Sequence, residues 1–286
     1  ARFASPDPQG PDVGGTWEAH FGVSDTTLGE PATGLFEQHD GIITGTFATE
    51  TGDYRYLEGV VRNDSLLLSG FDGGHAYLFE AAVRGDRLSG TFFSGPVHRE
   101  PWVAVRNSAW HLRDPDSLST VEADTAPIDL HFTTIDGITV GTATAGEGQV
   151  VVLQVMGSWC ANCMDESMLF NELYARHHAQ GLEMIALGFE KTDDPLASVR
   201  SLERFRQRLG IRYPIVHAGR ASAKAVRAVL PMLKDFMSYP TSIVIDRKGR
   251  VRRVHTGFYG PGTGEHYVRF KKEFEEFLEE LLSEAP

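Results

Sequence analysis

The only two cysteines of the chain, Cys160 and Cys163, lie in the segment GSWCANC at residues 157–163. Two thiols at this C-x-x-C spacing can form a structural disulfide, supply half of a zinc site, or act as a redox pair. A structural zinc site takes about four ligands, and the sequence has no second C-x-x-C or C-x-x-H, so we expect no metal. A structural disulfide that closes so short a loop would stabilise the fold only modestly. The spacing therefore favours redox chemistry.

The surroundings of the cysteines assign a role to each of them. Cys160 follows the apolar segment QVVVLQVM at residues 149–156 and precedes a helical pattern over residues 161–178. At a helix start the sulfur meets unpaired backbone N–H groups and the positive end of the helix dipole, both of which favour thiolate over thiol. Cys163 lies one turn further on. The positions predict Cys160 as the nucleophile and Cys163 as the buried resolving cysteine.

Residues 12–107 have the sequence pattern of an antiparallel β domain. Three segments each consist of two apolar stretches around a turn, and the turns lie at residues 39–41, 62–64 and 84–86. Gly-, Asn- and Asp-rich turns between such stretches indicate hairpins. They predict an antiparallel meander that is either curled into a barrel or stacked as a sandwich. Gly15-Thr16-Trp17 resembles the G-x-W opening of lipocalin-like barrels.

The pattern changes to strands alternating with helices after a segment rich in Asp, Ser and Pro. We interpret residues 108–127 as a linker and residues 128–286 as an α/β domain. Apolar strand patterns at 149–156 and 182–189 alternate with helical patterns at 161–178, 195–209 and 222–230. A hairpin at 241–257 and an amphipathic closing helix follow. The segment LPMLKDFM at 230–237 is either a helical extension or a longer plain connection.

Three motifs together give the α/β half a family resemblance. Trp159 directly precedes the C-x-x-C pair, ALGFEK ends the next strand, and SYPTSIVID begins about eighty residues after the cysteines. With this element order, residues 127–282 resemble the thioredoxin fold, and within it the TlpA/ResA-like thiol-disulfide oxidoreductases, which are membrane-anchored or periplasmic.

This resemblance implies a set of site residues, partners and a location. It makes Pro240 a cis-proline beside the cysteines, with Tyr239 offering backbone groups to an extended substrate strand. The implied substrate-binding residues are Trp159, Tyr239, Pro240 and Thr241. It further implies no cofactor, a disulfide-containing client protein, re-reduction by a membrane thiol donor, and a periplasmic or extracytoplasmic location.

Two departures from the family pattern bear on proton transfer and redox potential. Thioredoxins carry a buried Asp six residues before the first cysteine, where this chain has Gln154, and many relatives have Pro where it has Asn162. Glu190 ends the segment LEMIALGFE, and strand ends of this kind point into the active-site crevice of α/β sheets. Relatives carry a Glu at the matching strand end. We therefore predict that Glu190 is a buried or half-buried carboxylate beside the cysteines that shuttles protons during exchange.

Other functions are open to a chain of this composition. A peroxidase of the AhpC/TSA type would need the pattern P-x-x-x-T-x-x-C, and QVMGSWC lacks both the Pro and the Thr. A thioredoxin-fold copper chaperone would need C-x-x-x-C. A ligand- or partner-binding module with auxiliary thiols would place the main function in residues 12–107.

Charge and hydropathy exclude some partners. The net charge of −12 argues against a nucleic-acid surface. No apolar run approaches the roughly eighteen residues that a membrane span needs. The opening residues ARFASPDPQG suggest a trimmed or disordered end, with no signal or anchor visible.

Overall fold

The computed structural model describes residues 6–122, 127–142 and 148–285. The chain forms two compact units. Residues up to Arg113 group with Tyr259–Tyr267 in one, here called the barrel unit, and Asp114–Phe258 group with Val268–Pro286 in the other, the α/β unit. Residues 123–126 of the predicted linker lie outside the described residues.

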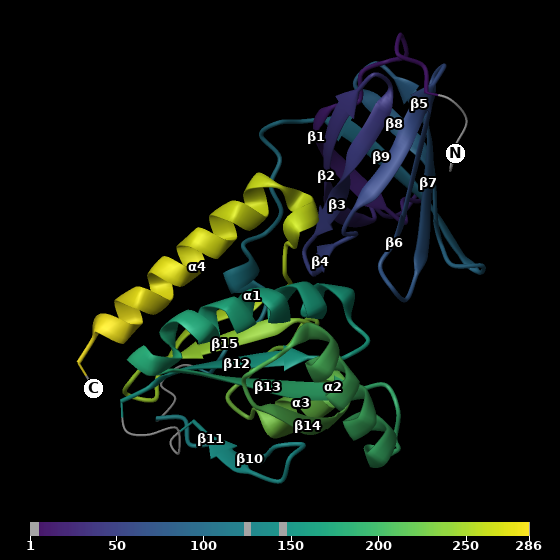
Figure 1. Cartoon of the computed structure of the whole chain (residues 1–286). Helices are drawn as coiled ribbons and strands as arrows, with labels where there is room; N and C mark the ends of the chain where they lie inside the picture. The colour runs from purple at the N-terminus through teal and green to yellow at the C-terminus, as the bar shows by residue number, and fades with distance from the viewer. Residues whose placement is uncertain (1–5, 123–126, 143–147, 286) are drawn as a thin grey trace. The chain divides into compact units, whose positions relative to one another are not determined.

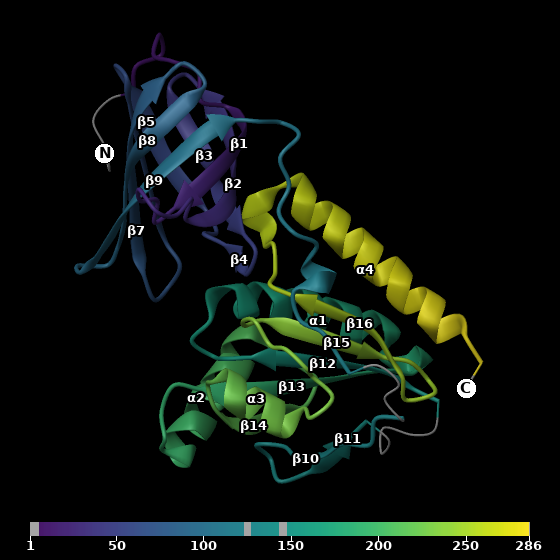
Figure 2. The ribbon, with the colours of Figure 1, turned by 180° about the vertical axis from the view of Figure 1, so that it is seen from behind.

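The barrel unit is a closed antiparallel barrel. Its strands are β1 (Gly15–Phe21), β2 (Glu30–His39), β3 (Ile42–Thr49), β4 (Gly52–Asp53), β5 (Leu57–Arg62), β6 (Ser65–Phe71), β7 (Ala76–Arg84), β8 (Arg87–Ser94) and β9 (His98–Arg106). They run in the order β2-β1-β9-β8-β7-β6-β5-β3, and the additional pairing of β2 with β3 closes the ring (Figures 1 and 2). β4 is added to β3. The predicted all-β fold is confirmed, and of its two forms the barrel is the one present.

Short turns with left-handed residues connect the hairpins of the barrel. Asp40 and Asn63 have φ values of 51° in the turns after β2 and β5, and Gly85 has a φ of 57° after β7. Asn, Asp and Gly tolerate this backbone region better than other residues do. These three turns are the ones that the sequence pattern indicates.

Aromatic side chains fill the barrel. Trp17, Phe47, Phe79 and Trp102 are fully buried, and Phe79 stacks on Phe92 with their ring centroids 4.5 Å apart. The interior of so small a barrel is just wide enough for side chains to fill it. The barrel interior is therefore a packed core.

Trp17, the tryptophan of the G-x-W segment, is held on both sides. Its indole N–H donates to the carbonyl of Val13 at 2.9 Å. The Arg106 guanidinium from the last strand lies 4.5 Å from the centre of its ring. Burial with a paired N–H is the arrangement that a core tryptophan needs.

The α/β unit is built on a five-stranded sheet. Its order is β14-β13-β12-β15-β16, with β12 (Val150–Met156), β13 (Leu182–Glu190) and β14 (Ile215–Arg220) parallel and β15 (Thr241–Ile245) and β16 (Val251–Thr256) antiparallel. The helices are α1 (Ala161–His177), α2 (Pro195–Leu209), α3 (Ala223–Val229) and α4 (Glu265–Ser283), and a small hairpin joins β10 (His131–Thr133) to β11 (Thr139–Gly141). The central strands β12 and β13 are buried throughout, because helices cover both faces of the sheet.

Alternate residues of the central strands face different helices. Val151, Leu153 and Val155 belong to the core that contains Val226 of α3. Gln154, which points to the other face, bonds to side chains of α1. Helix α4 packs against α1 there, with the rings of Phe170 and Phe274 stacked at 5.4 Å. This alternation follows from the period-2 geometry of strands.

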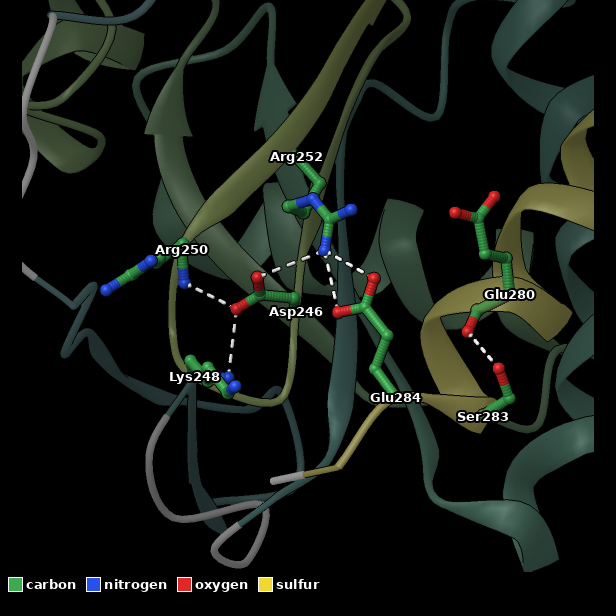
Figure 3. A network of polar contacts seen from close by, with 7 residues as sticks. All are labelled: Asp246, Lys248, Arg250, Arg252, Glu280, Ser283 and Glu284. Carbon is green, nitrogen blue, oxygen red and sulfur yellow. Dashed lines mark hydrogen bonds and ion pairs between the residues drawn. The ribbon is translucent and has the colours of Figure 1, made fainter.

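A polar network fixes the end of α4 to the β15–β16 turn (Figure 3). The Asp246 carboxylate accepts hydrogen bonds from the backbone N–H groups of Lys248 at 2.9 Å and Arg250 at 3.0 Å. Arg252 lies between the carboxylates of Asp246 and Glu284, at 3.4 and 2.8 Å. The β15–β16 turn and the residue that follows α4 thus share one cation.

The segment 230–237 is a plain connection. It forms no helix and carries one isolated bridge, between Leu233 and Val121. Of the two forms expected for this segment, the helical extension is therefore wrong. Pro231 disfavours a helix at this position. The backbone N–H groups of Lys234 and Asp235 donate to the Thr120 carbonyl, at 2.9 and 3.4 Å, which holds the extended path. Among the described residues, no helix is both long and apolar enough to cross a membrane.

Candidate active site

The two cysteines lie at the first turn of α1 and are joined by a disulfide. Cys160 is the N-cap residue, and its sulfur accepts a hydrogen bond from the backbone N–H of Cys163 at 3.2 Å. Cys160 is 8% exposed, whereas Cys163 is fully buried. A sulfur that caps a helix start faces the dipole's positive end, so Cys160 is the more accessible of the two sulfurs and lies where a thiolate is favoured.

Trp159 packs against the strand ends beside the disulfide. Its indole N–H donates to the carbonyl of Phe189 at 2.9 Å, and its ring meets Tyr239 edge-on at 5.5 Å. The Lys191 ammonium lies 4.2 Å from the centre of the indole ring. A Cβ atom at residue 157 would collide with this indole, which explains the glycine there. The turn before Cys160 is thus held against β13.

The segment Tyr239–Thr241 enters the sheet next to the cysteine turn. The Tyr239–Pro240 peptide bond is cis. Thr241 pairs with Val155 near the end of β12, the strand that leads to Cys160. The Thr241 hydroxyl donates to the carbonyl of Ser238 at 2.8 Å. The structure therefore brings Trp159, Tyr239, Pro240 and Thr241 to the same end of the sheet as the cysteines.

Glu190 is buried at the end of β13, and its carboxylate holds the cysteine turn. One oxygen accepts from the backbone N–H of Ser158 at 2.8 Å, and the other accepts from the Ser158 hydroxyl at 2.8 Å. Ser158 lies two residues before Cys160. The burial and the position are those expected from the sequence, and the observed contacts are with the turn that carries Cys160.

Glu166 is a further buried carboxyl near the cysteines, which the sequence reasoning missed. It is fully buried on α1, three residues after Cys163, and burial raises its pKa to about 8. Its Oε2 accepts a hydrogen bond from Gln154 Nε2 at 2.8 Å. Its Oε1 has no hydrogen-bond partner among the described residues. At neutral pH this carboxyl is mostly protonated.

Gln154 connects Glu166 to a buried polar network. The Gln154 amide oxygen accepts from the Tyr213 hydroxyl at 2.9 Å and from the Ser167 hydroxyl at 3.1 Å. The strand position that carries Asp in thioredoxins therefore holds the amide of Gln154. The buried carboxyl next to it belongs to Glu166 on the facing helix α1. The i, i+3 spacing of Cys163 and Glu166 was the available sequence signal, since such residues share a helix face.

One cluster outside the disulfide region has the residue types of a metal site. Ligand atoms of His177, Glu275 and Glu279 lie within 4.8 Å of one another. His177 Nε2 is 2.9 Å from a Glu275 oxygen, and Arg176 forms an ion pair with the same carboxylate. The Arg176 cation already neutralises Glu275, so these contacts are accounted for without a metal ion.

Comparison with known proteins shows what the α/β unit is similar to. Residues 123–254 match the AhpC/TSA family model. Thiol-disulfide oxidoreductase ResA of Geobacillus thermodenitrificans is 32% identical over 110 residues, which are 38% of this chain and 56% of the relative. ResA of Halalkalibacterium halodurans is 31% identical over 139 residues, 49% of this chain and 66% of the relative. The chain thus spans between about half and two thirds of the length of these relatives.

Solved structures were also found similar. A thioredoxin-family thiol:disulfide interchange protein from Chlorobium tepidum shares 20% identity, with 57% of this chain and 99% of that chain covered and a TM-score of 0.44. A secreted thiol-disulfide isomerase from Corynebacterium glutamicum shares 19% identity, with 62% and 99% covered and a TM-score of 0.45.

The α/β unit is a thioredoxin-fold domain. Within that class it is similar to the ResA/TlpA-like thiol-disulfide oxidoreductases, as the sequence motifs indicate. The family model that matches is named AhpC/TSA, and the peroxidase alternative is of the same type. Leu153 and Gly157 occupy the places of the Pro and the Thr that the peroxidase pattern requires before its cysteine.

Proposed function

We propose that this protein is a thiol-disulfide oxidoreductase that reduces disulfides of client proteins through Cys160 and Cys163. The observation that supports this proposal most directly is the disulfide at the first turn of α1, with the more accessible Cys160 at the N-cap and Cys163 fully buried. The cysteine turn lies at the sheet end where Tyr239–Thr241 begins β15. That segment can pair with an extended client strand.

The reaction proceeds in two exchanges. In the reduced protein the Cys160 thiolate attacks one sulfur of the client disulfide. A mixed disulfide forms, and the other client sulfur leaves as a thiolate that takes up a proton. The Cys163 thiol then loses its proton and attacks the Cys160 sulfur. The second client sulfur is released, so the client gains two electrons and the protein becomes the Cys160–Cys163 disulfide.

Glu166 is suited to the proton transfer in the second exchange. Cys163 is fully buried, so a group inside the protein has to accept its proton. Glu166 lies one helical turn away, and its pKa of about 8 leaves an ionised fraction near neutral pH. That ionised carboxylate can accept the Cys163 proton and return it later. Glu190 keeps the turn of Cys160 in place through Ser158.

The proposal includes the setting of the reaction. The clients are disulfide-containing proteins outside the cytoplasm, and a membrane thiol donor returns the oxidised protein to the dithiol form. The similarity to ResA/TlpA-like proteins supports this setting. No cofactor is involved, because all electrons pass between sulfur atoms.

Insulin reduction and trapping of the mixed disulfide test the function together. The wild-type chain is expected to reduce insulin with dithiothreitol as electron source, and Cys160→Ser is expected to abolish the activity. Cys163→Ser removes the resolving thiol, so a disulfide-linked client adduct should accumulate on Cys160, visible by non-reducing electrophoresis and mass spectrometry. Adduct formation on Cys163 in the Cys160→Ser protein would reverse the assignment. No reduction by the wild-type chain would refute the proposed function.

A further inference from the structure

A cleft lies between the cysteine turn and helix α2. It has a volume of about 380 Å³ and is lined by Ser158 of the turn, Met164 of α1, and Arg204, Phe205, Arg208 and Leu209 of α2. Ser158 lies two residues before Cys160, and Met164 directly follows Cys163. A chain segment bound in this cleft would therefore lie next to the reacting sulfur atoms.

Two arginines on the rim of the cleft have no carboxylate partner within the part of the chain that the structure describes. Helix α2 carries four arginines, of which Arg200 pairs with Asp194 at 3.8 Å and Arg206 pairs with Asp136. Arg204 contacts only the Ser201 hydroxyl, at 3.1 Å, and Arg208 has no hydrogen bond or ion pair among the residues that the structure describes. Both side chains are exposed.

This pair stands out because the chain is acidic. Asp and Glu outnumber Lys and Arg by 39 to 27. Arg204 and Arg208 lie four residues apart, so they point to the same side of the helix about one turn apart. Two guanidinium groups at this spacing can bind two carboxylates, each through paired N–H donors.

The apolar part of the cleft favours a peptide over a small anion. Met164, Phe205 and Leu209 line it beside the arginines. Methionine adapts its unbranched side chain to different partners. A peptide segment can place apolar side chains against these residues while its acidic side chains reach the arginines.

We propose that this cleft binds an acidic segment of the client protein that lies close in sequence to the client disulfide. Arg204 and Arg208 bind carboxylates of that segment, and the cleft thereby selects clients by the charge next to their cystine. The proposal rests on the proposed reductase function and adds the substrate class.

The kinetic test compares three disulfide-bonded peptides that differ only in the residues flanking the cystine, which are Glu, Gln or Lys. The preference for the acidic peptide is measured as kcat/KM for the Glu peptide divided by kcat/KM for the Gln peptide. In the Arg204→Gln/Arg208→Gln chain this ratio is expected to be on the order of tenfold lower than in wild type. Arg204→Glu/Arg208→Glu should reverse the preference in favour of the Lys peptide. The preference of the wild-type chain for the Glu peptide should weaken with added salt.

A matched control changes the same charges elsewhere. Lys224 and Arg227 are exposed on α3 and have no ion pair among the described contacts. Lys224→Gln/Arg227→Gln should keep the wild-type ratio. Equal ratios in the wild type and the Arg204/Arg208 variants, or an equal loss in the control, would overturn the proposal. Circular dichroism verifies that each variant is folded.

A binding measurement separates this proposal from the reductase function. A labelled Glu-rich peptide without cysteine is titrated with the oxidised wild-type chain and with Arg204→Gln/Arg208→Gln, beside the Gln-rich peptide. Binding that needs both the Glu residues and the arginines supports the cleft even if the chain reduces none of the disulfides. Reduction without any charge preference, together with no charge-dependent binding, refutes the cleft and leaves the reductase function standing.

Discussion

At the residue scale, the main chemical feature is a carboxyl that burial keeps protonated. Glu166 is fully buried, and its one hydrogen bond, from Gln154, does not compensate the loss of water around a charged carboxylate. The pKa of Glu166 is therefore raised to about 8. The same property that suits it to proton transfer makes it a source of pH-dependent stability.

We predict that Glu166→Gln removes a pH dependence of folding. Below about pH 4.5 the carboxyl is protonated in both the folded and the unfolded chain, and between about pH 4.5 and 8 the unfolded chain loses the proton first. Its contribution to stability is therefore lost as the pH rises towards 8. Urea unfolding of the oxidised proteins at about pH 5 and pH 9 measures this effect. The free energy of unfolding of the variant, relative to that of wild type, should be higher at about pH 9 than at about pH 5 by up to a few kcal/mol. A constant difference between the two proteins would contradict the assignment.

Glu190 tethers the cysteine turn through Ser158, and we predict that its carboxyl also influences the reactivity of the thiols. Two variants separate these roles. Glu190→Gln removes the charge and keeps an acceptor, so the titration of the Cys160 thiol should shift to lower pH and the rate of exchange should change. Glu190→Ala also removes both bonds to Ser158, at a cost of about 1–3 kcal/mol in folding. Iodoacetamide alkylation against pH and stopped-flow disulfide exchange measure the first effect. An unchanged profile and rate in Glu190→Gln would leave Glu190 as a purely structural residue.

At the element scale, strand ends and helix starts position every group of the site. The parallel strands β12 and β13 end side by side, with Met156 next to Gly188. The turn after β12 carries the cysteines, and the end of β13 supplies Phe189 and Glu190 to hold that turn. Because both strands are buried and paired along their length, these contacts are made from rigid elements.

The residues of the polar network at the end of α4 contribute unequally to the free energy of folding. Asp246 is 5% exposed and accepts two backbone N–H groups of the turn (Figure 3). Among the described residues, the Glu284 carboxylate is paired with Arg252 alone. We predict that Asp246→Ala costs about 2–3 kcal/mol of folding free energy, since it removes a buried charged acceptor of two backbone N–H groups and the ion pair with Arg252. Glu284→Ala should cost less than about 1 kcal/mol. Equal midpoints in chemical denaturation of the two variants would contradict this order.

At the scale of the whole molecule, the two compact units differ in the chemistry that their residues can perform. The barrel unit contains no cysteine, and aromatic side chains fill its interior. Residues Tyr259–Tyr267, which follow the last strand of the α/β unit, nevertheless group with the barrel. Gly260 donates its N–H to the Asp53 carboxylate at 2.6 Å there.

We predict that residues 6–113 fold alone as a β domain without reductase activity. The pairing of β2 with β3 closes the barrel within this stretch, so the later segment is not needed for closure. Far-UV circular dichroism of the fragment should show a β spectrum with a cooperative thermal transition, and insulin reduction should be absent. A spectrum of an unfolded chain would mean that residues 259–267 are required for the fold.

The sequence by itself determined the features that depend on local pattern. Cys160 and Cys163 at a strand-to-helix junction, the turns at Asp40, Asn63 and Gly85, and the alternation of strands and helices all follow from residue types within a few positions. The resemblance to TlpA/ResA-like proteins likewise rests on short motifs. Such features survive in any arrangement of the remaining chain, which is why they could be predicted.

The tertiary structure decided everything that depends on which distant residues meet. Closure of the sheet by β2 and β3 selects the barrel over the sandwich, although the same hairpins serve both. The raised pKa of Glu166 requires complete burial. That Arg204 and Arg208 have no carboxylate partner among the described residues is known only once the contacts of α2 are seen. Desolvation and charge pairing are sums over neighbours from the whole fold, so no local pattern of residues contains them.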